Sequence, residues 1–333
     1  MVRKIYYSNL DIWKFISAVF VVFLHTVNIS TLHGKAEITR QWLFRITQSI
    51  NPVEYFLIAT AFFLFKDLTY EKERKYIVRL LKLYAVWSVL YLPGAAIDCY
   101  EKNGCLIGTI KLFRRLFITG TSGHLWYILA VIYSLLFLFP LLNRKMIRSA
   151  QIISIISYLY VVAANSYSWI FANEGLFGKA IESINTVLGN SYILRAPLFL
   201  MIGYGLSSFD FKKIPTSVCF LGWVLCSFLC NFEVEKLSFW GDCSATLLKP
   251  MAAIALFAVA MKTKNYKSQY FSLLGKASSL TYFSHILVRD AIINAVLNPY
   301  ALWLATIIIC ICLTGVLEVL KKRADAKWVL FLY

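Results

Sequence analysis

The most regular feature of the chain is a succession of apolar blocks, separated by short polar and mostly basic stretches. A helix crosses the hydrocarbon core of a bilayer with about 20 largely apolar residues. The pattern therefore predicts an all-α, polytopic integral membrane bundle of about ten transmembrane helices. We expect spans near residues 12–29, 52–66, 77–98, 124–142, 150–171, 186–207, 214–231, 245–261, 272–294 and 300–320.

The segments between these blocks add two expectations. Residues 30–51 are expected to form an outer loop, in which His33 is exposed to solvent. Residues 106–118 alternate apolar residues with Lys111, Arg114 and Arg115, which predicts an amphipathic helix on the outer face. Because no internal repeat or low-complexity segment interrupts the pattern, we expect residues 1–333 to form a single membrane domain.

Composition supports the membrane class. Hydrophobic residues make up 59% of the chain and charged residues 15%, whereas about a quarter of a soluble domain is charged. A soluble protein of 333 residues has too little interior to bury so much apolar surface. The composition therefore excludes a soluble globular enzyme built only from this chain.

The basic residues predict the orientation of the chain. Most of them fall at the termini and in the loops that share their side, for example Arg3, Lys4 and the run Lys321–Arg323. Basic loops stay on the cytoplasmic side of a membrane. We therefore expect a multi-pass protein of the plasma (inner) membrane with both termini in the cytoplasm. The net charge of +17 then reflects topology and anionic lipid headgroups, and nucleic acid is not an expected partner.

Ionisable residues inside the first span are the first candidates for chemistry. A charge in lipid is costly and is by default a hypothesis of function. Lys14 and His25 are about three helical turns apart, roughly 16 Å along the axis, and so lie on nearly the same face. Asp11 lies one turn before Lys14, within reach of an ion pair. The alternative is that Asp11 and Lys14 lie at the interface, with His25 hydrogen-bonded between helices.

Two further histidines fall in or near spans. His124 begins the fourth span next to Trp126 and Tyr127, and His285 lies in the middle of the ninth span. For His124 the alternative is an interfacial residue in an aromatic belt. For His285 it is a hydrogen bond between helices.

Other polar positions have equally simple alternatives. Arg74, Lys75 and Arg79 lead into the third span, where they either anchor its topology or, in the case of Arg79, face a polyphosphate ligand. Glu54 follows Pro52 at the start of the second span, where interface location is the simplest account. The sequence contains no pattern of metal ligands, so no metal is expected.

Four segments in this order resemble the acyltransferase-3 family, whose membrane enzymes acylate surface glycans. They are Asn9–Thr26, Pro52–Phe65, Gly123–Leu129 and Leu274–His285. The first carries a basic residue followed by a histidine, the third is similar to a His-Leu-Trp-Phe signature, and the fourth ends in Tyr-x-x-His. The resemblance covers nearly the whole chain. Lys14 departs from it, because many members carry Arg there.

The resemblance implies transfer of an acyl group from acyl-coenzyme A to a hydroxyl of a lipid-linked or polymeric sugar. Acetyl is the default acyl group and succinyl the alternative. A thioester is already activated, so the enzyme needs a base, a stabilised oxyanion and close placement of its substrates. His25 is the expected base or, alternatively, a transient acyl carrier, because imidazole titrates near neutral pH.

The remaining roles follow from the same resemblance. The expected catalytic set is His25, Lys14, Asp11, His285 and His124; the expected coenzyme A set is Arg74, Lys75 and Arg79; and the expected sugar-binding set is Trp126, Tyr127 and Glu54. Asp11 and Lys14 are placed toward the donor, and His124 and His285 either donate to the oxyanion or bind the sugar. For the aromatic residues, contact with lipid or packing between helices is the alternative.

A transporter of glycans, a flippase or an exporter, is the competing class. It would explain polar residues inside spans equally well. The sequence lacks the repeated halves and paired broken helices of many transporters, which favours the acyltransferase.

Overall fold

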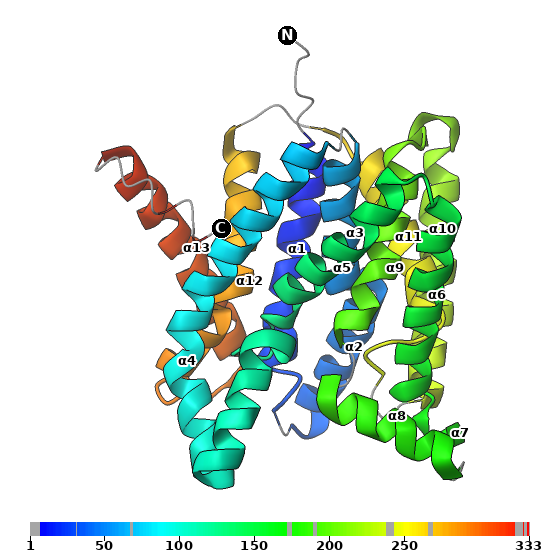
Figure 1. The fold of residues 1–333 in the computed structure, drawn as a ribbon. Helices are drawn as coiled ribbons and strands as arrows, with labels where there is room; N and C mark the ends of the chain where they lie inside the picture. Colours follow the sequence, from blue (N-terminus) through cyan, green and yellow to red (C-terminus); the bar gives the residue numbers. More distant parts are fainter. Residues whose placement is uncertain are drawn as a thin grey trace. The chain divides into compact units, whose positions relative to one another are not determined.

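The computed structural model describes residues 7–30, 32–66, 69–171, 175–188, 192–237, 243–265, 269–323, 329 and 332. The chain is 85% helical, and no strand occurs among these residues, which confirms the predicted all-α class. In chain order the elements are α1 (Ser8–His25), α2 (Gly34–Ile50), α3 (Pro52–Phe65), α4 (Tyr70–Arg114), the π-helical turn η1 (Arg115–Thr119), α5 (Trp126–Asn143), α6 (Ile147–Ala164), α7 (Ser168–Phe171), α8 (Gly175–Leu188), the 3-10 turn η2 (Tyr192–Arg195), α9 (Ala196–Ser207), the 3-10 turn η3 (Phe211–Lys213), α10 (Thr216–Leu237), α11 (Lys249–Lys262), α12 (Gln269–Ile292) and α13 (Pro299–Arg323) (Figure 1).

Each of the ten predicted spans overlaps at least one of these helices, although residues 189–191 of the sixth span lie outside the described residues. Six helical segments in the described part of the chain are long and apolar enough to cross a membrane: α1, α4 with η1, α5, α6, α10 and α13. The helices α3, α9 and α11 are shorter than a bilayer requires. The membrane character of the chain is thus supported, while the count of ten spans is not confirmed.

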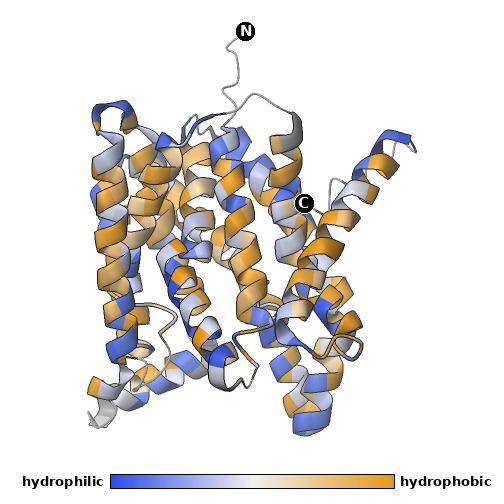
Figure 2. Cartoon of the chain, turned by 180° about the vertical axis from the view of Figure 1, so that it is seen from behind, coloured by the Kyte–Doolittle hydropathy of each residue, from blue (hydrophilic) through white to orange (hydrophobic). Residues whose placement is uncertain are grey.

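Rows of large apolar side chains on the outside of single helices fit a lipid environment. On α10, Leu221, Leu225 and Phe228 are exposed, and on α13 so are Leu304 and Ile308. Figure 2 shows apolar residues along most of the length of these helices, with hydrophilic residues mainly near their ends. In lipid such rows carry no penalty, because the hydrocarbon tails around them are as apolar as the side chains themselves.

Two connecting segments differ from expectation. Residues 34–50 form the helix α2 rather than a loop; its periodicity is hidden because its side chains are largely polar. The helix α4 contains Gly104 at φ 71°, where the chain changes direction. The following segment folds back along α4, since the Tyr84 hydroxyl donates to the Leu116 carbonyl at 2.5 Å and Arg115 pairs with Asp98. The predicted amphipathic helix therefore exists as the second arm of a hairpin; its place on the outer face stays a prediction.

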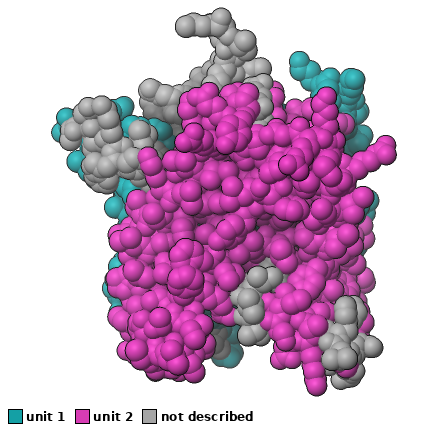
Figure 3. All heavy atoms as spheres, in the orientation of Figure 1, with its two compact units in different colours: residues 1–56, 210–228, 251–333 teal, residues 57–209, 229–250 magenta. Residues whose placement is uncertain are grey.

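The chain divides into two compact units (Figure 3). Unit 1 comprises residues 1–56, 210–228 and 251–333, and unit 2 comprises residues 57–209 and 229–250. The division falls within α3, α10 and α11. The prediction of a single membrane domain stays a prediction, and each unit is described below by itself.

Unit 1 is built on α1, α12 and α13. The indole of Trp303 on α13 donates to the Val19 carbonyl at 2.9 Å, and its ring lies against Phe20 and Phe23 of α1. Lys276 of α12 forms an ion pair with Glu318 of α13 at 2.5 Å. These contacts fix α1 between its two partners and so determine which of its faces is buried.

Unit 2 is built on α5, α6 and α9. Tyr158 of α6 packs its ring edge-on against Phe199 of α9 and donates its hydroxyl to the Thr246 carbonyl at 2.7 Å. Gly203 of α9 lies directly on α3, where a Cβ would stand 2.5 Å from Ala61 Cβ and 2.6 Å from the Ile58 carbonyl oxygen. Only a residue without a side chain permits this approach of the two helices.

Candidate functional site

The helices α1 and α12 of unit 1 run parallel and hold two polar groups of α1 at opposite ends of their contact. Near its start, Asp11 lies against Gly275, where a Cβ would stand 2.9 Å from the Asp11 carboxyl carbon. At its end, the His25 carbonyl accepts a hydrogen bond of 2.8 Å from Arg289. Asp11 and His25 are about four helical turns apart, roughly 21 Å, and so are Gly275 and Arg289.

His25 and His285 form a pair of imidazoles. Their ring centroids are 5.1 Å apart and the ring planes are inclined by 40°. The Nδ1 atom of His285 is 2.8 Å from the Tyr282 carbonyl and 3.1 Å from the Thr281 carbonyl. Since a carbonyl oxygen only accepts, Nδ1 must carry the proton, and in the neutral ring the lone pair then resides on Nε2. His285 is fully buried, whereas His25 is partly exposed.

Arg289 holds the end of α1 beside this pair. Its guanidinium donates to the His25 carbonyl and pairs with Asp290 at 2.5 Å. The last carbonyls of a helix carry partial negative charge and lack partners within the helix, which favours a cation there. Arg289 is not among the candidate site residues drawn from the sequence. The signal that could have identified it is its spacing of one helical turn from His285.

Asp11 and Lys14 form the predicted ion pair. Lys14 Nζ lies 3.5 Å from Asp11 Oδ1, and the two side chains are 23% and 16% exposed. Because Gly275 has no side chain, the backbone of α12 reaches the carboxylate directly. This contact gives a physical reason for a glycine in the segment Leu274–His285.

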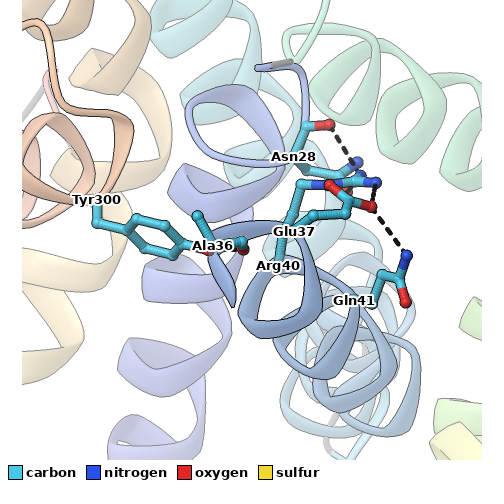
Figure 4. Close-up of polar contacts among 6 residues, drawn as sticks. All are labelled: Asn28, Ala36, Glu37, Arg40, Gln41 and Tyr300. Carbon is cyan, nitrogen blue, oxygen red and sulfur yellow. Dashed lines mark hydrogen bonds and ion pairs between the residues drawn. The ribbon is translucent and has the colours of Figure 1, made fainter. Parts of the chain in front are cut away.

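Polar contacts also fix the chain that follows His25 (Figure 4). Arg40 of α2 donates to both carboxylate oxygens of Glu37, at 2.5 and 2.7 Å, and to the side chain of Asn28 at 3.2 Å. The hydroxyl of Tyr300 donates to the Ala36 carbonyl at 2.6 Å. Hydrogen bonds from Arg40 and Gln41 lower the pKa of Glu37 to about 2. The start of α2 is thereby tied to the chain after α1 and to the start of α13.

His124 of unit 2 lies in the turn before α5 and is buried. Its Nδ1 is 3.2 Å from the Ser122 hydroxyl, and its ring meets that of Tyr91 edge-on with centroids 5.1 Å apart. Tyr91 was not singled out from the sequence, because its contact with His124 depends on the approach of α4 to this turn, whereas Ser122 lies only two residues from His124 in the same turn.

The aromatic residues that follow His124 pack within unit 2. Arg195 is buried, with its guanidinium carbon 4.8 Å from the Trp126 ring centre and 5.7 Å from that of Tyr192. It also donates to the Ser244 carbonyl at 2.6 Å. The stacking of the guanidinium on these aromatic rings explains how Arg195 can be buried. The Tyr127 hydroxyl lies 3.2 Å from that of Thr60.

The basic residues expected to bind coenzyme A lie on α4 of unit 2. Arg74, Lys75 and Arg79 are all exposed. Lys75 pairs with Glu71 at 2.6 Å, one helical turn earlier. Such an exposed pair contributes little to stability. Because all three side chains are exposed, they are accessible to a ligand on this side of α4.

The structure thus brings some of the predicted residues together. In unit 1 it pairs Asp11 with Lys14 and His25 with His285, and it buries Glu54 in the first turn of α3. The other predicted residues, His124, Trp126, Tyr127, Arg74, Lys75 and Arg79, belong to unit 2. Their predicted roles remain predictions.

Comparison with known proteins supplies the family. The acyltransferase-3 family, described as an acyltransferase domain, matches residues 7–319. The chain belongs to the acyltransferase-3 family. It is also 24% identical to an amino-acid racemase of Enterococcus faecalis, over 97% of this chain and 47% of the relative. The chain therefore spans about half the length of the curated relative it matches. No solved structure matches it.

Proposed function

We propose that this membrane acyltransferase moves an acyl group from acyl-coenzyme A to a hydroxyl of a lipid-linked or polymeric surface sugar. Acetyl is the expected group, and succinyl the alternative. The observation that carries the proposal is the pair of imidazoles at 5.1 Å, with the His285 Nδ1 proton directed to backbone carbonyls. Membership in the family supports the reaction class.

In the proposed step His25 removes the proton of the acceptor hydroxyl. The oxygen attacks the thioester carbonyl, and a tetrahedral oxyanion forms. When this collapses, the new C–O ester bond remains, the C–S bond breaks, and the coenzyme A thiolate takes the proton from the His25 imidazolium. General base catalysis of this kind contributes about 10²–10⁴-fold to the rate. A transient acyl group on His25 is the alternative route.

The donor is proposed to bind through the basic residues. Arg74, Lys75 and Arg79 offer their charges to the phosphates of coenzyme A, since Arg forks match phosphate geometry. The exposure of all three supports this assignment. Lys14, held near Asp11, is proposed to act toward the donor as well.

The acceptor sugar is proposed to use Glu54, Trp126 and Tyr127, with His124 as a further donor to the oxyanion or to the sugar. Carboxylates pair with sugar hydroxyls, and aromatic rings provide flat apolar faces for stacking. Glu54 is buried in the first turn of α3, so its carboxyl group belongs to the interior of unit 1 and not to its surface.

We further propose that the protein lies in the plasma (inner) membrane with both termini in the cytoplasm. The support is the excess of Lys and Arg in the loops on the side of the termini. This orientation would give the basic start of α4 access to cytoplasmic acyl-coenzyme A.

A glycan transporter is the second candidate, and one observation favours it. A break at Asn51–Pro52 separates α2 from α3, and many transporters bind substrate at interrupted helices. Turnover of an acyl donor distinguishes the two candidates. Racemase activity is not proposed for this chain, because the chain covers about half of the racemase and that protein's name does not say which half acts.

Purified protein in liposomes would test the function. Release of free coenzyme A from acetyl- and succinyl-coenzyme A is followed for the wild type, His25→Ala and His285→Ala. His33→Ala is the matched control, since His33 is exposed and precedes α2. We expect release by the wild type and the control, and a loss of about 10²-fold or more in His25→Ala.

The opposite outcome is equally informative. If neither donor releases coenzyme A, while a lipid-linked glycan still crosses the bilayer in the wild type, the acyltransferase proposal is wrong and the transporter stands. If His25→Ala retains the full rate in correctly folded protein, His25 is not the base.

A further inference from the structure

The chain breaks between α2 and α3 in an unusual way. Asn51 adopts φ 47° and ψ 64°, the left-handed conformation, and Pro52 begins the next helix. Asn tolerates this conformation better than most residues, and Pro is favoured in the first helical position, where its missing N–H is no loss. The break therefore follows directly from the dipeptide Asn51–Pro52. We call residues 48–54 the elbow.

The elbow is held against three helices of unit 1. The Ser49 carbonyl accepts a hydrogen bond of 3.0 Å from the indole of Trp223 on α10. After the elbow, the Tyr55 hydroxyl donates to the Leu10 carbonyl of α1 at 3.3 Å, and Phe56 packs edge-on against Tyr282 of α12. The elbow is thus inside the unit and not on a surface loop.

The elbow is also close to the histidine pair. The ring centroids of Phe56 and Tyr282 are 5.6 Å apart, and those of Tyr282 and His285 are 6.4 Å apart. Tyr282 lies midway along α12 between Gly275 and Arg289, about two helical turns from each. The elbow therefore adjoins the stretch of α12 that runs between the Asp11–Lys14 pair and His285.

The side chain of Asn51 is the observation that points to a ligand. Asn51 is 1% exposed, and neither Nδ2 nor Oδ1 has a hydrogen-bond partner among the residues that the structure describes. A buried carboxamide normally satisfies both groups, and leaving them unsatisfied destabilises the fold. The backbone of Asn51 is satisfied, because its N–H donates to the Thr47 carbonyl and its carbonyl accepts from Tyr55, both at 2.9 Å. The side-chain carboxamide of Asn51 is thus not needed to hold the break between α2 and α3.

The chemistry of the elbow indicates an uncharged ligand rich in hydroxyl groups. A carboxamide offers an NH2 group with two N–H donors and a carbonyl oxygen that accepts, and together these match one hydroxyl group or two adjacent ones. Glu54 is buried one turn later in the same segment, and a carboxyl group so close in the chain favours an uncharged ligand over a phosphate or carboxylate. We propose that the elbow binds a sugar ring of the acyl acceptor, with the Asn51 carboxamide paired to its hydroxyl groups. This inference rests on the proposed function.

The test separates acceptor binding from donor chemistry. Release of coenzyme A from acetyl-coenzyme A is measured without acceptor and with methyl glycosides of glucose, galactose and N-acetylglucosamine. Asn51→Gly removes the amide and suits φ 47° at no steric cost. We expect unchanged acceptor-independent hydrolysis, an acceptor KM raised on the order of tenfold for the lost hydrogen bonds, and a thermal midpoint equal to or above that of the wild type.

Asn165→Gly is the matched control. Asn165 is also a buried residue after a helix, but its Nδ2 donates to the Val161 carbonyl at 2.8 Å. We expect lower stability and an unchanged acceptor KM. If Asn51→Gly does not fold, Asn51→Asp, which keeps the acceptor oxygens and loses the donor, is measured instead and should also raise the acceptor KM.

Several outcomes would overturn the inference. These are an unchanged acceptor KM in Asn51→Gly, an equal loss of both reactions, and a wild type that hydrolyses acetyl-coenzyme A without any response to the three glycosides. If the wild type releases no coenzyme A at all, the proposed function fails first. Thermal stabilisation of the wild type by a glycoside, lost in Asn51→Gly, would then still support the sugar site, and its absence would overturn that as well.

Discussion

Arg289 of α12 donates a hydrogen bond of 2.8 Å to the backbone carbonyl of His25, the last residue of α1. The contact joins two positions that are far apart in the chain and places a fixed positive charge at the end of the helix that carries the proposed base. We predict from this contact that Arg289 is a positioning residue, which acts through His25 and not by contact with a substrate.

Replacing Arg289 should therefore reduce catalysis more than stability. We expect Arg289→Gln to lower kcat/KM for acyl transfer about tenfold, because a hydrogen bond from a charged group is lost, about 1.5–3 kcal/mol, and to displace the pH optimum. A pH profile of acetyl-coenzyme A turnover measures both. Asp290→Asn is the control, since Asp290 is 54% exposed and its ion pair contributes little. An unaltered rate and pH profile in Arg289→Gln would show that Arg289 does not position His25.

A methyl group at Gly275 should displace Asp11. The new Cβ would stand 2.9 Å from both the carboxyl carbon and Oδ1 of Asp11, closer than side-chain atoms pack. The carboxylate must move, and the 3.5 Å contact with Lys14 changes with it. We expect Gly275→Ala to lower the acyl-transfer rate several-fold, on the order of the 1–3 kcal/mol typical of overpacking.

The matched control for that change is Gly315→Ala on α13 of the same unit, where nothing lies within 4 Å of the added Cβ. Alanine is the better helix former by about 1 kcal/mol, so this variant should be fully active and slightly more stable. Equal activities of the two variants would disprove a functional contact between Asp11 and the α12 backbone.

Two glycines of α9 should respond in opposite ways to the same substitution. At Gly203 the added Cβ would stand 2.6 Å from the backbone oxygen of Ile58, which cannot easily move, whereas at Gly205 nothing lies within 4 Å. We expect Gly203→Ala to destabilise the protein by about 1–3 kcal/mol or more and Gly205→Ala to leave it unchanged or stabilise it. Thermal unfolding in detergent compares them, and equal midpoints would contradict the close packing of α9 on α3.

The Glu37–Arg40 pair should make the start of α2 sensitive to acid. Hydrogen bonds from Arg40 and Gln41 lower the pKa of Glu37 from 4.5 to about 2. A lowered pKa in the folded state gives stability that is present above pH 4.5 and is lost as the pH falls toward 2. Hydrogen exchange of α2 amides should show a small protection advantage of the wild type over Glu37→Gln at pH 6 that shrinks toward pH 3. An advantage that grows with acid would be inconsistent with the pair.

The sequence located most of the helices because the bilayer demands long apolar blocks, and such blocks are visible in any single sequence. It missed α2 because a helix with mostly polar side chains lacks that signal. The number of spans was harder to predict, since α3, α9 and α11 are apolar but shorter than a bilayer crossing. Where these three short helices lie depends on how they pack against neighbouring helices.

The candidate site divides in the same way. Asp11 and Lys14 could be paired from the sequence, because residues one helical turn apart are neighbours on any helix. Three other features could not be predicted from the sequence. They are the contact between His25 and His285, the contact between Gly275 and Asp11, and the burial of Asn51 with an unsatisfied side-chain carboxamide. The burial of Arg195 likewise depends on its stacking against Trp126 and Tyr192, which only the tertiary structure shows.

The sequence by itself determined the membrane class and the helical architecture, because these depend on local composition and on spacing within single helices, and its resemblance to a family indicated acyl transfer. Only the tertiary structure decided that α1 runs parallel to α12, with Arg289 at the end of α1 and His285 beside His25. Contacts between helices depend on which faces pack together, and this is set by the shapes of residues such as Gly275 and Trp303, whose partners lie far away in the chain.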